Sequence, residues 1–324
     1  MRQSAFVKKI GLNRIILAGV LVLMVIVFRV FSPTFLSYAR LLSILNYACF
    51  LGFLALAVTF AIATGGIDFS VGPVMFCAAL ISGQLLTKSD MPVLLCLIIS
   101  VAVGTMFGIL NGALVAYVGL PSFITSMASM MIAKGVGSVF TKTQSVSWPQ
   151  SSDPKGWYRN LLRLRAGDMQ IPLGLIILIA VAVLCAIILN KTHAGRYILC
   201  LGSNKEAVRL SGVNVRKWEM LAYVICGTLA GIAAIFYVSA YTTVQPGLGD
   251  TFNNEAIASC VMGGTSMAGG LASVGGTIFG TMIISVLQEG IMAMGFQKDY
   301  QYVLTGIIVL IAVYMDIRSR KRKN

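Results

Sequence analysis

Long apolar runs follow one another from one end of this 324-residue chain to the other. Each run is roughly 15–25 residues long, close to the length that a helix needs to cross a lipid bilayer. Because lipid offers no hydrogen bonds, a chain inside it must satisfy its own backbone groups, and a helix does so. With 57% hydrophobic and only 11% charged residues, the composition excludes a soluble globular domain. The sequence therefore predicts an all-α integral membrane protein.

Both ends of the chain are basic. Residues 1–14 contain four basic residues and no acid, and residues 318–323 are mostly Arg and Lys. The apolar run Ile15–Phe31 lacks an obvious small-x-small cleavage site, so we interpret it as an uncleaved first span. The positive-inside rule places both termini in the cytoplasm, which requires an even number of spans. We predict about ten, at residues 15–32, 44–64, 73–87, 93–117, 122–140, 171–189, 218–240, 254–268, 275–295 and 302–316.

The formal net charge of +14 is carried mainly by short loops and tails between the apolar runs. The positive-inside rule explains this pattern, so we predict membrane lipid, and no nucleic acid, as a partner. The loop at 141–170 is an exception, because the even count places it outside although it is basic. We retain that placement because moving the loop inside breaks the parity at both ends. Its basic residues are Lys142, Lys155, Arg159, Arg163 and Arg165.

The cysteines and histidine offer little chemistry. The seven cysteines form no CxxC pair, and the single histidine, His193, lies in a basic loop. All the cysteines but Cys200 lie in or beside apolar runs, which is typical of small packing residues. A zinc site or a disulfide framework is unsupported. We predict no metal, no cofactor and no catalytic residue.

Residues 65–73 (Gly-Gly-Ile-Asp-Phe-Ser-Val-Gly-Pro) interrupt the apolar sequence with three glycines, a proline and the carboxylate of Asp68. Two interpretations are open. In the first, the stretch is a tight turn between two spans, and Asp68 caps the second span. In the second, it is a broken helix that lines a transport path, where a membrane protein tolerates irregular backbone and charge.

The two halves of the chain share features in the same order. The sequence Gly-Thr-Met-Phe-Gly at 104–108 recurs as Gly-Thr-Ile-Phe-Gly at 276–280, each in the fourth span of its half. A second break at 245–252, with glycines, an Asp and a Phe, precedes the short third span of the second half. Short, glycine-interrupted spans at matching positions of two halves point to a transport site.

These matches predict two five-helix repeats, the first at about 15–140 and the second at about 171–316. An odd number of spans in each half makes the repeats inverted relative to each other. Gly227 and Gly231 form a small-xxx-small pattern, which allows close helix contact. We expect this pattern to serve packing within the subunit rather than dimerisation.

The loop at 190–217 is predicted to be cytoplasmic. Within it, Asn204–Leu210 is typical of a short amphipathic helix, because Asn204 is a good N-cap and Gly212 a C-terminal stop. The residues alone allow two interpretations of this helix. It either lies on anionic lipid, with Lys and Arg at the headgroups, or docks a cytoplasmic partner.

Three stretches together resemble the permease subunits of ribose-type ABC importers, a family that handles ribose, xylose, arabinose, galactose and related small ligands. They are the break at 65–73, the loop sequence at 195–215, and Ala-Ile-Ala-Ser-Cys-Val-Met-Gly-Gly-Thr-Ser-Met-Ala-Gly-Gly at 256–270. The three lie in the family's order, and the resemblance covers nearly the whole chain. Phe69, Pro73, Ala272 and the stretch 252–255 depart from the usual pattern, which puts the particular sugar in doubt.

The resemblance implies one permease domain over 1–324 with ten helices in two inverted repeats, placed in the bacterial plasma (inner) membrane. It also implies three partners: a second permease subunit, identical or different, ATP-binding subunits, and an extracytoplasmic (periplasmic) sugar-binding protein. The ATP-binding subunits would dock on a cytoplasmic coupling loop at 192–215. The candidate coupling residues are Arg196, Gly202, Asn204, Arg209, Leu210, Ser211 and Gly212.

The expected function is the translocation subunit of a binding-protein-dependent, ATP-driven importer of a pentose or hexose. The chain has no GxxxxGK[ST] pattern, so we expect ATP hydrolysis in a separate subunit and class this chain as no enzyme. An ion-coupled secondary transporter is the alternative, with Asp68, Glu255 and Glu289 as candidate carboxylates. The candidate pathway or gate residues, each of which could equally be a cap or an interhelical hydrogen bond, are Asn46, Thr59, Asp68, Ser70, Thr251, Asn254 and Glu255.

Overall fold

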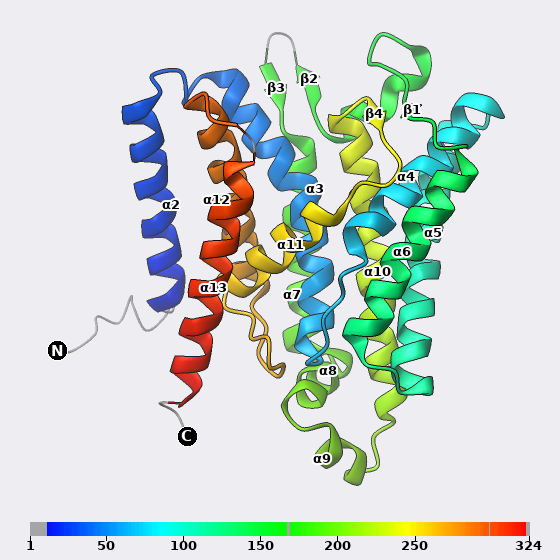
Figure 1. Cartoon of the computed structure of the whole chain (residues 1–324), viewed down its shortest axis with the longest axis vertical. Coiled ribbons are helices and arrows are strands. Elements are labelled where there is room, and N and C mark those ends of the chain that lie inside the picture. Colours follow the sequence, from blue (N-terminus) through cyan, green and yellow to red (C-terminus); the bar gives the residue numbers. More distant parts are fainter. Residues whose placement is uncertain (1–11, 167–168, 298, 322–324) are drawn as a thin grey trace.

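The computed structural model describes residues 12–166, 169–297 and 299–321, and it is built almost entirely of helices (Figure 1). The long helices run roughly parallel to the long axis of the molecule. The helices are α2 (Leu12–Phe31), α3 (Tyr38–Ala63), α4 (Val71–Lys88), α5 (Val93–Ala113), α6 (Ser122–Phe140), α7 (Leu173–Lys191), α8 (His193–Ser203), α9 (Lys205–Leu210), α10 (Val215–Ala240), α11 (Asp250–Met262), α12 (Val274–Ala293) and α13 (Tyr300–Lys321), with a π-helical turn η1 (Leu114–Val118) and a 3-10 helix η2 (Pro154–Leu161).

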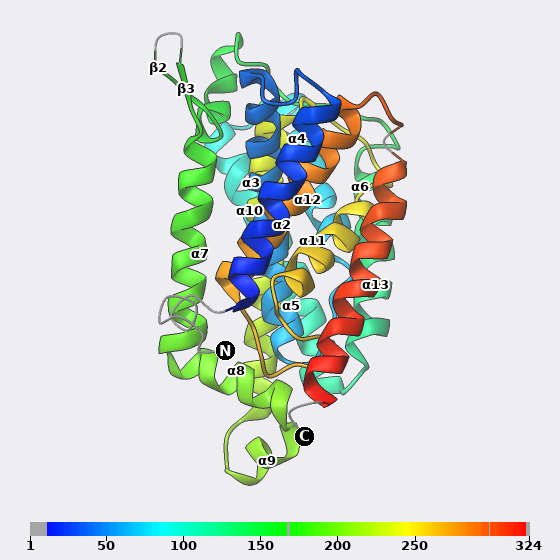
Figure 2. The same cartoon turned by 90° about the vertical axis from the view of Figure 1, so that its left-hand side faces the viewer.

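Two small antiparallel ribbons lie at one end of the molecule, which we call the hairpin end (Figure 1, with β2 and β3 also labelled in Figure 2). One pairs β1 (Val146–Ser147) with β4 (Thr243–Val244), with Val146 opposite Val244. The other pairs β2 (Leu164–Ala166) with β3 (Met169–Ile171). Helices α8 and α9 lie at the opposite end, which we call the α9 end.

Seven helices in the described part of the chain are long and apolar enough to cross a membrane: α3, α4, α5 with η1, α6, α7, α10 and α12. The chain is therefore a multi-pass membrane protein. The span predicted at 254–268 is longer than the helix observed, because α11 ends at Met262 and irregular backbone follows as far as Ser273. Its 13 residues reach about 20 Å, which is short of the ~30 Å hydrocarbon layer.

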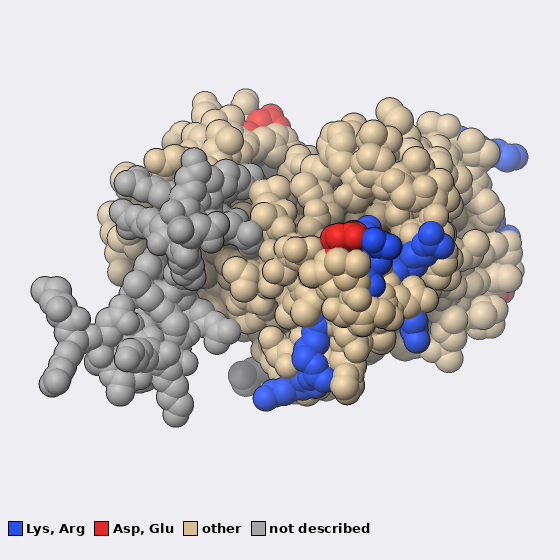
Figure 3. Space-filling model, turned by 90° about the horizontal axis from the view of Figure 1, so that it is seen from below, with Lys and Arg blue, Asp and Glu red and all other residues tan. Residues whose placement is uncertain are grey.

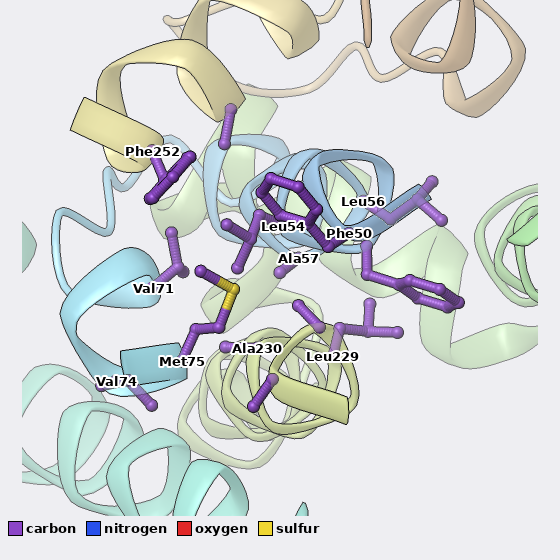
Figure 4. Packing of buried hydrophobic residues seen from close by; sticks show 14 of the residues in the cluster. Phe50, Leu54, Leu56, Ala57, Val71, Val74, Met75, Leu229, Ala230 and Phe252 are labelled. Carbon is purple, nitrogen blue, oxygen red and sulfur yellow. The ribbon is translucent and has the colours of Figure 1, made fainter. Parts of the chain in front are cut away.

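Helix α3 is the centre of the core. Every residue from Asn46 to Ala63 is buried, because α10, α11 and α12 pack around this helix together with α7. Figure 4 shows Phe50, Leu54 and other α3 side chains meeting side chains of α4, α10 and α11. The helix begins at Tyr38, earlier than the predicted residue 44. Its first turn contains the charged Arg40, which the helix accommodates because Arg40 pairs with Glu289 at 3.7 Å.

Glycines bring α5 and α10 into backbone contact. A Cβ on Gly104 would lie 2.6 Å from the backbone nitrogen of Gly231, and one on Gly108 would lie 2.5 Å from the carbonyl oxygen of Tyr223. Such distances leave no room for any side chain, so these positions require glycine. Gly227 lies in the same contact, where a Cβ would meet Gly108. The prediction that Gly227 and Gly231 serve packing within the subunit is confirmed.

Two basic residues of the hairpin end, Lys155 and Arg159, have structural partners. Lys155 forms an ion pair with Asp90. Arg159 donates a hydrogen bond to the carbonyl oxygen of Ser239, 3.3 Å away, in the last turn of α10. Cations near a helix C-terminus are favourable because they complement the unsatisfied carbonyls there. These contacts give Lys155 and Arg159 of the 141–170 loop a structural role on either side of the membrane.

Candidate functional site

The two chain breaks predicted from the sequence lie against each other. After α3 ends at Ala63, Gly65 adopts a left-handed φ of 85° and the chain stays non-helical until α4 begins. After β4, Gly249 has φ 121° and directly precedes α11. A Cβ on Gly72 would overlap the carbonyl oxygen of Gly249, and one on Gly249 would lie 2.7 Å from the nitrogen of Pro73. The breaks are thus joined by backbone contact.

Asn253 of α11 caps α4 from the other half of the chain. The first turn of a helix has amide groups without partners, and Ser70, at the N-cap position of α4, makes no side-chain capping bond. Instead the Asn253 Oδ1 accepts a hydrogen bond from the Gly72 amide at 2.6 Å. Its Nδ2 donates to the Phe69 carbonyl oxygen. The sequence analysis missed this residue, since its partner lies 181 residues away.

Asp68 organises the first break through a buried network. Its Oδ1 accepts hydrogen bonds from the Ser70 amide at 2.8 Å and the Ser70 hydroxyl at 2.6 Å. Its Oδ2 accepts from Asn111 Nδ2 at 3.4 Å and from the Cys226 thiol at 3.5 Å. Asp68 is only 2% exposed. These bonds tie the break to α5 and α10, so the Asp68 carboxylate holds the shape of the broken helix.

A cavity of about 530 Å³ opens beside the joined breaks. It lies between α11, α13 and the first break, and three of the seven candidate pathway residues line it: Thr251, Asn254 and Glu255. Asn254 is exposed, whereas Glu255 is buried. The other lining residues are Phe69, Ile257, Met267, Tyr302, Thr305, Gly306 and Leu310.

Polar atoms of the lining residue Thr305, and of Gln301, which bonds the lining residue Glu255, have incomplete hydrogen bonds. Tyr47 donates its hydroxyl to Glu255, and Gln301 Nε2 donates to Glu255 at 2.9 Å. The Gln301 Oε1 and the Thr305 hydroxyl are buried without a hydrogen-bond partner among the described residues. Buried polar atoms in proteins normally have partners, so a cavity beside such atoms is suited to a ligand or water that supplies them.

The other four candidate pathway residues are not among those that line the cavity. Asp68 and Ser70 belong to the network of the first break. Asn46 accepts a hydrogen bond from Arg163 Nε at 2.8 Å, near the hairpin end. The Thr59 hydroxyl lies 3.1 Å from that of Thr277 and joins α3 to α12.

Lys134 of α6 forms an ion pair with Asp250 at the start of α11. The side chains are 26% and 51% exposed, respectively. Asp250 is next to Thr251, so the pair stands at the edge of the cavity. A lysine inside an apolar span is expensive in lipid, and it is a signal that the sequence analysis could have used.

The predicted helix in the loop at 190–217 is confirmed as α9. The Asn204 Oδ1 accepts a hydrogen bond from the Ala207 amide at 2.9 Å, and Gly212 follows the helix with φ 76°. Leu210 is 74% exposed. Arg209 donates two hydrogen bonds to Glu206, and these bonds hold the pKa of Glu206 below its ordinary value. The helix thus presents a leucine beside charged groups.

Helix α8 was not predicted. Thr192 begins it, because its hydroxyl accepts a hydrogen bond from the Gly195 amide at 3.2 Å. Two other candidate coupling residues make local bonds: Arg196 donates to the Lys191 carbonyl, and Ser211 to that of Ala207. Figure 3 shows Lys and Arg side chains gathered around a small acidic patch when the molecule is seen from the α9 end.

Among the described residues, no group of three His, Cys, Asp or Glu side chains is placed to hold a metal ion. The polar residues that line the cavity offer hydrogen bonds, beside a broken-helix junction in a multi-pass membrane protein. Broken helices that meet beside a cavity are characteristic of transporters.

Residues 40–313 match the model of a protein family described as "Branched-chain amino acid transport system / permease component". The chain belongs to this family of ABC-importer permeases, which are transport subunits. It is 31% identical over 306 residues to the ribose import permease protein RbsC of Escherichia coli K12, covering 94% of this chain and 93% of the relative.

Two further relatives are similar over almost the whole chain. The ribose import permease protein RbsC of Bacillus subtilis is 32% identical, with 91% of this chain and 90% of the relative covered. The fructose import permease protein FrcC of Rhizobium meliloti is 31% identical, with 93% and 84% covered. No solved structure matches the chain. These relatives identify the chain as a permease of the ribose type.

Proposed function

We propose that the chain is the translocation subunit of a binding-protein-dependent, ATP-driven importer of a monosaccharide, either a pentose or a hexose. The observation that carries this proposal is the 530 Å³ cavity, whose wall offers Asn254, Glu255 and Thr305. A sugar presents several hydroxyls, which both donate and accept hydrogen bonds, so it can complete those of the buried Thr305. The ribose and fructose permeases named above support the same class of cargo.

We further propose one permease domain of ten membrane helices in two inverted repeats, at about 15–140 and 171–316. The reciprocal packing of the halves supports this: α5 packs on α10, and α12 packs on α3, so the fourth helix of each half meets the second helix of the other. The start of α2 and the end of α13 both point toward the α9 end (Figure 1). With the α9 end in the cytoplasm of a bacterial cell, both termini are cytoplasmic and the hairpin end faces outward.

The proposed partners occupy three faces. ATP-binding subunits dock on the coupling loop 192–215, where Leu210 is exposed and apolar. The sugar-binding protein docks at the hairpin end. A second permease subunit, identical or different, covers the side formed by α6, α11 and α13, where the half-exposed pair of Lys134 and Asp250 would be expensive against lipid. Nucleotide binding at the α9 end then drives alternating access to the cavity.

We expect Asn254→Ala to reduce sugar uptake roughly fivefold, because one hydrogen bond of about 1 kcal/mol is worth about a factor of five in an equilibrium constant. The measurement is ATP-driven uptake into proteoliposomes that contain the whole transporter, with the binding protein added. Asn190→Ala is the matched control, because Asn190 is exposed at the end of α7 and its side chain, within the described part of the chain, bonds the Ala186 carbonyl of its own helix. Equal uptake by both variants would remove Asn254 from the pathway.

The same vesicles distinguish the alternative of an ion-coupled secondary transporter. The buried carboxylate of Glu255 in the cavity wall is the observation that favours that alternative. An ATP-driven importer takes up sugar only when ATP and the ATP-binding subunit are present. Uptake that follows a proton or Na⁺ gradient without either of them would overturn the proposed function.

We expect Leu210→Asp to abolish copurification of the ATP-binding subunit, since it puts a charge into the contact that the exposed leucine is proposed to make. Truncating or charging a central apolar anchor typically weakens a protein complex by 2 kcal/mol or more, which is about 30-fold. The control is Leu164→Asp, the same change at an exposed leucine of the hairpin end. Unchanged copurification would show that α9 lies on lipid instead.

A further inference from the structure

Three separate segments of the chain meet backbone to backbone at the α9 end, at a point that we call the glycine junction: Gly65, Gly202 and the turn Gly269–Gly270. Gly202 lies in the last turn of α8, and a Cβ there would overlap the carbonyl oxygen of Ala63, the last residue of α3. A Cβ on Gly269 would lie 2.8 Å from the Cα of Gly202 and 2.7 Å from the nitrogen of Gly65. No side chain separates the three segments.

The glycine junction is bonded as well as closely packed. The Gly270 amide donates a hydrogen bond to the Ala63 carbonyl oxygen at 3.1 Å. Gly65, Gly269 and Gly270 all have φ between 78° and 85°, in the region that favours glycine. Contacts between flexible side chains can absorb a small displacement by changing rotamer, whereas contacts between backbones cannot. If α8 is displaced, the other two segments must therefore move with it.

Two short chain segments connect the glycine junction to the cavity. Phe69 follows Gly65 by four residues, and Met267 precedes Gly269 by two. Both side chains line the cavity, one from each of the two irregular segments. The Phe69 ring also packs edge-on against Phe123 of α6, with centroids 5.6 Å apart. Movement of the glycine junction therefore reaches two apolar side chains of the cavity wall.

We infer that Gly202 and Gly269 are positioning residues for transport, which carry a displacement of α8 to Phe69 and Met267 as one unit and so gate the cavity. The inference rests on the proposed function, in which ATP-binding subunits move the 192–215 loop. It goes beyond that function by naming the contact through which the movement passes and the two side chains that respond to it.

The test is Gly202→Ala in the complete transporter with its ATP-binding subunits and binding protein, reconstituted in vesicles. The readout is the number of sugar molecules taken up per ATP hydrolysed. We expect that ratio to fall at least tenfold while the subunits stay associated and ATP hydrolysis continues, because the added methyl group forces α8 away from Ala63. An unchanged ratio in an assembled Gly202→Ala transporter overturns the inference.

A matched control makes the same change elsewhere. Gly19→Ala adds a methyl group on α2, where no atom beyond the backbone of its own helix lies within 4 Å. We expect it to keep the ratio within twofold. If the unchanged transporter shows no ATP-dependent uptake, the proposed function fails. If it transports and Gly202→Ala leaves the ratio unchanged, the inference alone fails.

A second measurement does not depend on whether Gly202→Ala folds. Met267→Cys and Phe69→Cys are made separately in a Cys200→Ser background, because the other native cysteines are buried. The rate of maleimide labelling is compared with and without a non-hydrolysable ATP analogue. We expect the analogue to change both rates at least fivefold. A change at only one position, or at neither, shows that the two segments do not move as a unit and overturns the inference.

Discussion

We expect Asp68→Asn to lower the free energy of unfolding by about 3 kcal/mol, since unsatisfied buried groups cost about 1–3 kcal/mol each. The carboxylate accepts hydrogen bonds from Ser70 on one oxygen and from Asn111 and Cys226 on the other. An amide has only one acceptor atom, so either orientation of the new side chain turns two N–H groups toward existing donors. Transport should be lost with the shape of the first break.

The measurement is a denaturant titration of the purified protein in detergent, followed by uptake in proteoliposomes. Asp90→Asn is the control, because Asp90 is an exposed carboxylate whose ion pair among the described residues is with Lys155 at the hairpin end. We expect that change to stay within about 0.5 kcal/mol of the unchanged protein. If Asp68→Asn has the same free energy of unfolding as Asp90→Asn and transports normally, the Asp68 network does not hold the break.

The second large effect is expected at Asn253. Asn253→Ala removes the cap of α4 and leaves the Gly72 amide and the Phe69 carbonyl without partners, which should destabilise the protein by about 3 kcal/mol. The neighbouring change Asn254→Ala is the control, since Asn254 is exposed and should alter stability by less than about 0.5 kcal/mol.

The two neighbouring changes therefore separate folding from transport. Asn253→Ala should lower the unfolding midpoint, and Asn254→Ala should lower uptake without shifting that midpoint. Circular dichroism during a denaturant titration gives the first quantity, and vesicle uptake gives the second. Equal midpoints for the two variants would mean that Asn253 contributes no cap.

Features that depend on neighbouring residues could be predicted from the sequence. Helix α9 is an example, because its N-cap at Asn204 and its stop at Gly212 are both local. The break at 65–73 is another, since glycine and proline end helices wherever they occur. The role of Asp68 in holding that break follows from the same proximity, as Ser70 is two residues away.

The sequence could not reveal features that depend on distant partners. In the sequence, Asn253 cannot be distinguished from an ordinary polar residue of a helix. It becomes a cap because α4 lies against it in the fold. Gly202 is a candidate coupling residue by resemblance, but its backbone contact with Ala63 exists only once α8 has formed and packed on α3. The helix expected at 254–268 ends at Met262, where the local pair Gly263-Gly264 stops it and Gly264 has φ 89°; only the packing of Gly263 on the backbone of Gly276 depends on a distant partner.

The cap of α4 can form only late in the synthesis of the chain. Asn253 follows Gly72 by 181 residues. A ribosome that adds about 5–20 residues per second reaches Asn253 roughly 10–35 s after Gly72. For that interval the newly synthesised first half holds a broken helix whose amide has no partner. The nascent chain is therefore most vulnerable to membrane proteases and to misassembly before its second half emerges, and the duration of that risk is set by the rate of translation.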